Sequence, residues 1–205
     1  MDVGPVSPLL DNLLGLLKKE NYWDVILPVM ENQRSIYAHS LNVCFLALAF
    51  INYLGWSQRS AQVFGLGALL HDIGMSKVPH SILNKKGPLT EDEMDKVKLH
   101  PLTGYHLLKN HAWMYKNALL MVLQHHENAD GSGYPQKLAT QAIHPWAKVL
   151  RIVDSYEAMT SVRPWRGPFS PREALWNIRQ GVEQQKLYDP DLFKAFVKFL
   201  AAHEK

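Results

Sequence analysis

The sequence has very little cysteine. Cys44 is the only one among 205 residues. A lone thiol cannot close an internal disulfide, and secreted proteins commonly depend on disulfides, so we expect a cytoplasmic protein. Cys44 lies in an apolar run, which favours a buried, unreactive side chain. The shortage of thiols also argues against a structural zinc knot.

Long apolar runs are also missing. No stretch reaches the roughly 18 uninterrupted apolar residues that a membrane span requires. The amino-terminal segment has no basic leader before its leucines and carries Asp11 among them. It therefore does not resemble a secretory signal peptide, and we expect no membrane partner.

An excess of charge of one sign is absent as well. The 22 Lys and Arg residues against 19 Asp and Glu residues give a formal net charge of +3. Proteins that bind DNA through bulk charge carry a clear basic surplus, so we expect no DNA partner. With 47% hydrophobic and 20% charged residues, the composition is typical of a folded globular domain.

Apolar residues recur at spacings of three and four along most of the chain, while sustained alternation is missing. This periodicity predicts an all-α fold, with caps at Ser57, Thr90, Ser170 and Asp189. Residues 74–90, rich in Gly, Pro and Lys, are predicted to form a loop. The predicted helices cover about residues 9–17, 22–31, 34–54, 58–72, 90–98, 101–107, 114–127 and 145–160, and two more begin at residues 170 and 189.

We divide the chain into an amino-terminal helical extension, residues 1–33, and one compact unit, residues 34–205. No internal repeat or linker separates further domains. The leucines of the first helix leave three interpretations open: core residues, a remnant linker, or the face of a homodimer.

Histidine is what the sequence has in plenty, with ten residues. Five of them and two aspartates fall at the ends of predicted helices or one turn in from the ends. Imidazole and carboxylate groups together suit Fe, Mn, Ni, Zn or Co. The candidate ligands are His39, His71, Asp72, His100, His125, His126 and Asp154.

The prediction of a metal site depends most on the His71–Asp72 pair and on Asp154. Adjacent side chains on a helix point about 100° apart, so His71 and Asp72 can approach an ion only from flanking directions. The Asp72 carboxylate can then reach a second ion, as a two-metal site requires. Asp154 lies in an apolar helix, where burial is costly unless a cation or donors meet the carboxylate. The alternative is an aspartate on the exposed face of that helix.

Four segments, in order, resemble the HD-GYP domain, a subgroup of the HD metal-dependent phosphohydrolases. They are HDIGMSKVPHSILNKKGPLTEDEM, HPLTGYHLL, HHENADGSGYPQKL and AKVLRIVDSYEAMTSVRPWR. The resemblance covers about residues 34–195. It implies an HD-type helical bundle around a metal centre, extended here by helices at both ends. It also implies hydrolysis of the bacterial second messenger cyclic di-GMP to linear pGpG or GMP.

The resemblance assigns metal binding to the seven candidate ligands. Trinuclear members add a glutamate one helical turn before the first histidine, where this chain has Ser35. We therefore expect two divalent ions, Fe or Mn by resemblance, with Ni, Zn, Co or Mg as alternatives.

The resemblance also assigns residues to the cyclic dinucleotide substrate. Tyr134 of the GYP triplet, which includes Gly133 and Pro135, is expected to contact it. Arg163 and Arg166 are expected to bind its phosphates through their fork-shaped donors.

One position departs from the family pattern. Met75 stands where the family has a lysine, and a methionine cannot pair with a phosphate. Among catalytic residues we therefore expect Asp72 to bridge the ions, and Lys77 to replace the missing lysine or to protonate the leaving group. A water at the metal centre is the alternative proton donor.

Three functions stay open. The first is an active cyclic di-GMP phosphodiesterase. The second is a catalytically weak module that senses the nucleotide or docks a diguanylate cyclase domain through the GYP loop. The third is an HD phosphohydrolase acting on another nucleotide. The complete ligand series favours the first over the second, and the GYP triplet with the two arginines favours it over the third.

Overall fold

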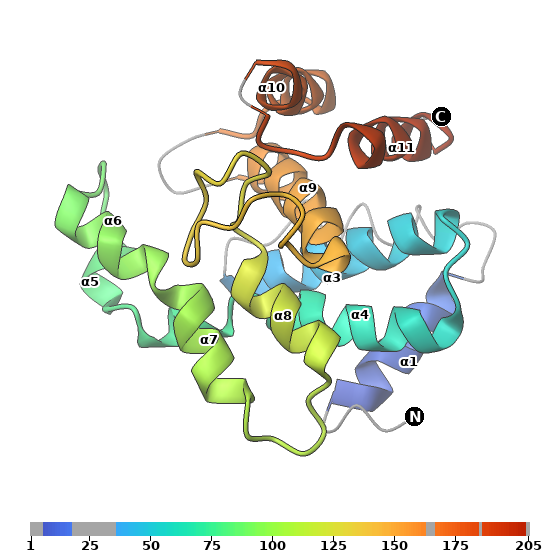
Figure 1. The fold of residues 1–205 in the computed structure, drawn as a ribbon, viewed down its shortest axis with the longest axis horizontal. Helices are drawn as coiled ribbons and strands as arrows, with labels where there is room; N and C mark the ends of the chain where they lie inside the picture. Colours follow the sequence, from blue (N-terminus) through green and yellow to red (C-terminus); the bar gives the residue numbers. More distant parts are fainter. Residues whose placement is uncertain (1–5, 18–35, 163–166, 185, 204–205) are drawn as a thin grey trace.

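The computed structural model describes residues 6–17, 36–162, 167–184 and 186–203. Within these ranges it contains helices and one isolated β-bridge between Asp130 and Ala139, with no strand (Figure 1). The all-α prediction is confirmed. The elements are α1 (Ser7–Leu16), α3 (Ile36–Tyr53), α4 (Gln58–Leu70), η2 (Ile73–Lys77, a 3₁₀-helix), α5 (His80–Leu83), α6 (Glu91–Lys98), α7 (His100–Leu108), α8 (Lys116–Gln124), α9 (Pro145–Thr160), α10 (Pro171–Glu183) and α11 (Pro190–Ala201).

Helix α3 lies at the centre of the core because it is covered on several sides. It packs against α4, α9 and α11, and α4 in turn packs against α8 and α1. Residues 43–51 of α3 are all buried, which explains why this helix is apolar around its whole circumference. Phe50 packs against Phe196 and Phe199 of α11, with ring centroids 5.1 and 5.4 Å apart.

Leu10, Leu13 and Leu14 of α1 belong to the hydrophobic core, which supports the core interpretation of the first helix. Cys44 is buried, and burial raises the pKa of its thiol to about 12, so it is an inert core residue. In the described part of the chain no helix is long and apolar enough to cross a membrane.

The predicted helix starts are found where the capping residues stand. A cap of this kind contributes about 1 kcal/mol, because its side-chain oxygen satisfies a backbone N–H that has no partner within the helix. The capping side chains are those of Ser57, Thr90 with Glu93, Ser170 with Glu173, and Asp189.

Two predicted boundaries are wrong, and one predicted helix lies outside the described residues. The segment 74–90 is not a single loop, since it contains part of η2 and all of α5. Buried Gly74 and Ile82 tie these short helices to the rest of the fold. Helix α8 is shorter than predicted because the chain turns into the next loop after Gln124. The predicted helix over 22–31 and the domain boundary at residue 33 fall in the segment that is not described.

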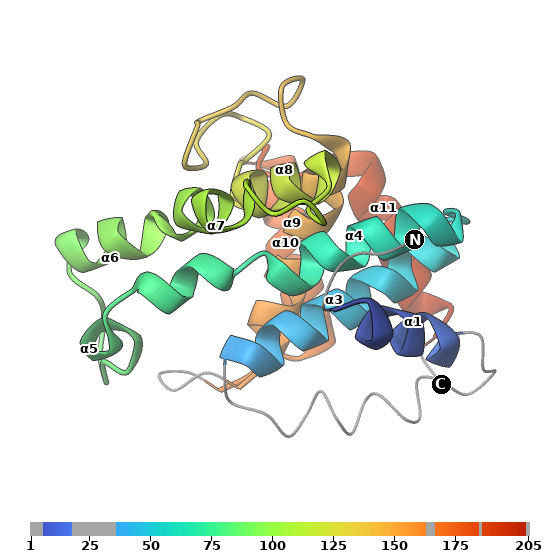
Figure 2. The same cartoon turned by 90° about the horizontal axis from the view of Figure 1, so that it is seen from below.

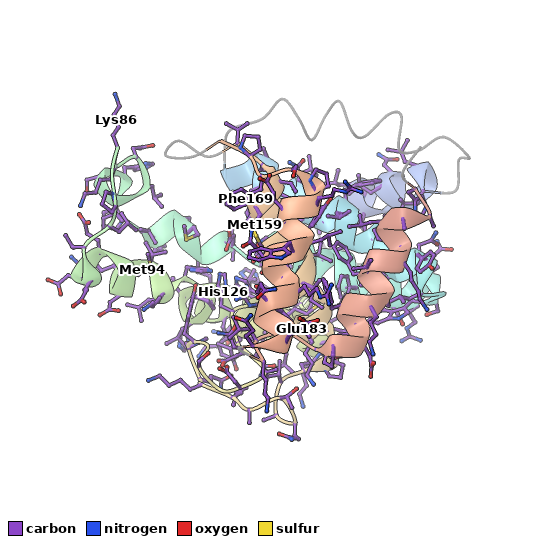
Figure 3. The ribbon with its side chains drawn as sticks, turned by 90° about the horizontal axis from the view of Figure 1, so that it is seen from above. Lys86, Met94, His126, Met159, Phe169 and Glu183 are labelled. Atoms are coloured by element: carbon purple, nitrogen blue, oxygen red, sulfur yellow. The ribbon has the colours of Figure 1, made fainter. Side chains whose placement is uncertain are left out.

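Helices α5 and α6 project from the body of the molecule (Figure 2). No residue of α6 is buried. In Figure 3, Lys86 and Met94 mark this arm, and His126 lies apart from them in the body. Helix α7 begins where the arm joins the body, so its first residue, His100, lies near the centre of the fold.

Candidate metal centre

The seven candidate ligands come together in space. They are carried by α3, the C-terminal end of α4, the N-terminal end of α7, the C-terminal end of α8, and α9. Ligand atoms of six of them form two groups, each with all atoms within 4.8 Å of one another. One group contains His39, His71 and Asp72, and the other contains Asp72, His100, His125 and His126. Asp154 lies beside the first group, with Oδ1 3.1 Å from His39 Nε2 and 3.9 Å from His71 Nε2.

Asp72 is shared by both groups, and each of its oxygens faces one of them. Oδ1 lies 3.1 Å from His100 Nε2 and 3.6 Å from His125 Nε2. Oδ2 lies 3.7 Å from His39 Nε2 and 3.6 Å from His71 Nε2. Helix α4 ends just before Asp72, whose backbone has left the helical conformation (φ −97°, ψ 9°). Neighbouring residues can therefore turn their side chains toward one point, as a bridging carboxylate needs.

His71, His100 and His125 are oriented by the same local device. The Nδ1 atom of each ring lies 2.7 to 2.9 Å from the carbonyl oxygen three residues earlier in the chain. A carbonyl oxygen only accepts, so Nδ1 carries the proton and Nε2 keeps its lone pair. In all three residues Nε2 faces Asp72, which is the tautomer and orientation that a metal ligand requires.

His71 Nε2 provides the direct test of whether these residues fit a metal. It is buried and has no hydrogen-bond partner in the described part of the chain. A buried polar atom left without a partner costs about 1 to 3 kcal/mol. Its lone pair lies 3.6 Å from one carboxylate and 3.9 Å from another, and a cation placed among these atoms would satisfy all three. The donor set therefore fits a divalent ion.

Two imidazoles of the second group, His125 and His126, are kept neutral by their surroundings. Burial lowers the pKa of His125 to about 4, although the nearby Asp72 carboxylate opposes the change. Burial, with the neighbouring His125, holds the pKa of His126 well below its usual value. Both rings are therefore uncharged at neutral pH, and a neutral imidazole is the form that binds metal.

Both aspartates are ionised despite their burial. For Asp154, burial raises the pKa, but the hydrogen bond from His39 and the nearby charge of this ring lower it by more. The net pKa is therefore below the usual value. For Asp72, the effect of burial is likewise outweighed, here by the nearby rings of His71, His100 and His125. Asp154 is only 5% exposed, so the alternative of an aspartate on an exposed helix face is wrong.

Glu157 is a part of the site that the sequence analysis missed. Its carboxylate accepts a hydrogen bond from His39 Nδ1 and also from Asn42 Nδ2 at 3.0 Å and Ser161 Oγ at 2.7 Å. Burial alone would lower the pKa of His39, but the hydrogen bonds to Asp154 and Glu157 raise it to about 10. Glu157 therefore fixes the ring that presents Nε2 to the first group. The available signal was its position, one turn after Asp154 in an apolar helix.

Tyr134 lies at the edge of the second group. Its ring stacks on that of His126, with centroids 4.8 Å apart and planes 26° apart. The backbone before it passes so close to the end of α8 that a Cβ on Gly133 would lie 2.3 Å from Asn128 N and 2.5 Å from Glu127 Cα. Only glycine fits at this position. The peptide bond between Tyr134 and Pro135 is cis. The GYP triplet thus delivers a tyrosine to the metal centre.

Glu127, the third residue of the HHE sequence, has a different role. It is buried and accepts backbone hydrogen bonds from Gln136 N at 2.6 Å and Leu138 N at 2.8 Å. The structure thus uses this carboxylate to close the loop that carries Tyr134.

The remaining predicted residues are placed less centrally or are not described. Met75 is partly exposed in η2. Lys77 is exposed and lines, together with His100, a cavity of about 280 Å³. Ser35, Arg163 and Arg166 lie outside the described residues.

Comparison with known proteins decides the family. A family model described as HD domain matches residues 25–192. The chain belongs to the HD domain family. This membership implies divalent metal binding, and the His/Asp cluster is able to provide it. The resemblance to the HD-GYP subgroup is confirmed by the relatives.

Three relatives show how far the similarity extends. A cyclic di-GMP phosphodiesterase of Pseudomonas aeruginosa is 35% identical over 199 residues, 97% of this chain and 47% of the relative. A cyclic di-GMP phosphodiesterase of Thermotoga maritima is 32% identical, over 86% of this chain and 50% of the relative. A 3′3′-cGAMP-specific phosphodiesterase of Vibrio cholerae is 28% identical, over 95% and 45%. The HD-family chain thus spans about half the length of the curated relatives it matches.

Solved structures confirm the HD fold. A HDG"Y"P protein from Bdellovibrio bacteriovorus superimposes with a TM-score of 0.78 at 18% identity, over 98% of this chain and 65% of that one. The HD domain of L. monocytogenes phosphodiesterase PgpH, in complex with cyclic-di-AMP, gives 0.60 at 20% identity, over 92% and 94%. At these identities the likeness concerns the fold alone.

Proposed function

We propose that this chain is a metal-dependent phosphodiesterase that hydrolyses cyclic di-GMP to linear pGpG or GMP. The observation that carries the proposal is the Asp72 carboxylate, which presents one oxygen to each of two imidazole groups. Relatives named cyclic di-GMP phosphodiesterases align with up to 97% of the chain and support the choice of substrate.

Two divalent ions would be held by the two groups. His39, His71, Asp154 and Asp72 Oδ2 would hold one, and His100, His125, His126 and Asp72 Oδ1 the other. When bound, such ions polarise a phosphodiester and lower the pKa of water. Donors that are nitrogen and oxygen without thiolate suit iron or manganese, our first choice, and also Ni, Zn or Co.

The substrate would lie over the second group. Tyr134, held by Gly133 and Pro135, offers its ring and hydroxyl beside His126. Arg163 and Arg166 would hold the phosphate oxygens, because a guanidinium donates to two of them at once. In the reaction, the oxygen of water bonds to phosphorus and the bond from phosphorus to the 3′-oxygen breaks. Lys77, which lines a cavity together with His100, would pass a proton to the departing oxygen and recover one from the proton that the attacking water loses.

The test is hydrolysis by purified protein loaded with Fe(II) or Mn(II) under reducing conditions. We expect cyclic di-GMP to be linearised, and Asp72→Ala to lose both metal and activity. Asp95→Ala is the matched control, because Asp95 is an exposed aspartate of α6 with only a 3.8 Å pairing to Lys98. Nucleotide binding without turnover in every metal tested would contradict the proposal.

Two other candidate functions have an observation in their favour. Met75 in place of the family's lysine favours a weak sensor, or a module that docks a diguanylate cyclase domain through the GYP loop. Relatives named as 3′3′-cGAMP-specific, and the structural neighbour bound to cyclic-di-AMP, favour another cyclic dinucleotide. Hydrolysis of the three dinucleotides side by side separates these candidates. A homodimer and a cytoplasmic location stay predictions from the sequence.

A further inference from the structure

The segment that carries Tyr134 is a long connection between α8 and α9. We call residues 128–140 the GYP loop. Two side chains at the end of α8 hold this connection: Glu127 accepts from two of its backbone amides, and Gln124 accepts from His144 N at 2.8 Å. These contacts fix its second half and its end. Its first half, which leads into Tyr134, is held from α9.

Arg151 of α9 makes side-chain contacts that hold this first half, in addition to the backbone hydrogen bond from Tyr134 N to His126 O at 3.2 Å. The Nε and Nη2 atoms of Arg151 donate to Asn128 Oδ1 at 3.3 and 3.1 Å, and Nη1 donates to Ser155 Oγ at 2.7 Å. The guanidinium carbon lies 5.1 Å from the centre of the Tyr188 ring, in a cation–π contact. Arg151 thus connects the loop, its own helix and the segment between α10 and α11.

Asn128 passes this support along the loop. Its Nδ2 atom donates to Ser132 Oγ at 3.0 Å, while Ser132 N and Oγ both donate to Asp130 Oδ1 at 2.9 and 2.7 Å. Gly133 follows directly, pressed against the end of α8, and then comes Tyr134. The guanidinium therefore supports the turn from which the tyrosine emerges.

The segment between α10 and α11 supports the same turn from the other side. Ala129 N donates to Leu187 O at 2.9 Å, and Tyr188 OH donates to Ser155 Oγ at 3.2 Å. Gly181 of α10 makes room for Tyr188, because a Cβ there would lie 2.6 Å from Tyr188 Cε2. Figure 1 shows this segment passing beside the connection between α8 and α9.

We propose that Arg151 is a positioning residue, which holds the GYP loop against α9 so that Tyr134 stays stacked on His126. This inference rests on the proposed function, in which Tyr134 contacts the nucleotide. A lysine would not replace Arg151. The planar guanidinium reaches Asn128, Ser155 and the Tyr188 ring at the same time, and a single ammonium group cannot.

Hydrogen exchange of the metal-loaded protein tests the proposal without any substrate. In Arg151→Met we expect the amides of residues 129–134 to exchange about tenfold faster, because local opening becomes easier when this half of the loop loses its support. Amides of α3 and α8 should exchange as before, and the metal content should not change. Arg179→Met is the matched control, because Arg179 is an exposed arginine of α10 that pairs with Glu183.

Kinetics provide the second measurement. We expect Arg151→Met to raise KM for cyclic di-GMP about tenfold with kcat nearly unchanged, since the tyrosine binds rather than reacts. Tyr188→Phe keeps the ring on the guanidinium and loses only the hydroxyl, so it should resemble the wild type. If Arg151→Met does not fold, Asn128→Ala removes the acceptor on the loop side and should give the same exchange pattern.

The outcomes separate the two proposals. A wild-type protein that hydrolyses no dinucleotide contradicts the proposed function, while loop exchange still tests Arg151. Unchanged exchange in Arg151→Met and Asn128→Ala would overturn the inference. So would faster exchange throughout the protein with loss of metal, which indicates a general structural role, or a Tyr188→Phe variant as strongly affected as Arg151→Met.

Discussion

His100 and His125 face one another with their Nε2 atoms 3.1 Å apart. Each ring has its Nδ1 atom within 2.9 Å of a backbone carbonyl oxygen and so keeps its proton on that side. Two lone pairs at this distance repel unless a proton or a metal ion lies between them. Burial lowers the pKa of His125 to about 4, so this ring takes up no second proton at neutral pH. The arrangement therefore favours occupation by a cation.

The contact between η2 and α7 predicts a strong effect of Gly74→Ala. A Cβ at Gly74 would lie 2.0 Å from His100 O and 2.7 Å from Gly104 N, both backbone atoms that cannot rotate away. We expect a loss of about 3 kcal/mol in the free energy of unfolding, measured in urea, together with reduced metal content. Gly87→Ala is the control: a Cβ there meets nothing within 4 Å, and the change should stay within about 0.5 kcal/mol. Equal stability of the two variants would contradict the packing described.

The contacts of His39 predict proton release on metal binding. Without metal its pKa of about 10 keeps the ring protonated at neutral pH, and an ion at Nε2 must displace that proton. At pH values below this pKa, the affinity for Mn(II) should therefore increase by up to about tenfold for each unit by which the pH is raised. Titration calorimetry between about pH 7 and about pH 9, in buffers of different ionisation enthalpy, would detect one proton released.

Glu157→Gln is the variant that separates His39 from other titrating groups. Loss of this carboxylate removes one of the hydrogen bonds that raise the pKa of His39. The affinity for Mn(II) should therefore stop increasing with pH at a lower pH than in the wild type. Affinity should also fall about 10- to 100-fold, because a partner that orients a metal-binding histidine is lost. Glu183→Gln, on the exposed surface of α10, should change neither quantity. A pH-independent affinity in the wild type would refute the assignment.

Met75 predicts a gain of activity when the family's lysine is restored. Because Met75 is partly exposed, Met75→Lys should fold normally and raise kcat/KM for cyclic di-GMP about tenfold by adding a cation near the phosphate. Met75→Leu should leave the rate unchanged. A lower or unchanged rate for Met75→Lys would show that Lys77, or no side chain, fills this role, and Lys77→Met then distinguishes the two.

Much of the fold could be predicted from the sequence because its signals are local. Helical periodicity and the caps at Ser57, Thr90, Ser170 and Asp189 depend on neighbours within four residues. The short helices η2 and α5 could not be predicted, since their segment is rich in Gly and Pro. Helix η2 is held in place by contacts with α7, which is distant in sequence.

Part of the candidate site could likewise be predicted from the sequence, and part could not. The ligand series was recognisable because the histidines stand at helix ends in a fixed order. Glu157 and Arg151 were not, because each is defined by partners more than 20 positions away: His39 for one, Asn128 for the other. The position of Glu157, one turn after Asp154, marks it as a candidate, but neither it nor Arg151 shows in the local sequence which ring or loop it holds.

The junction between α4 and η2 sets a limit on how this chain can vary. His71 is the cap of one helix and Asp72 the first residue outside it, and each must reach the same point. One residue inserted between them would turn the carboxylate by about 100° and separate its two oxygens from both sets of imidazoles. The spacing of these two residues is therefore fixed by geometry, whereas we expect length changes to be tolerated in the turn around Gly87, where a Cβ would meet nothing within 4 Å.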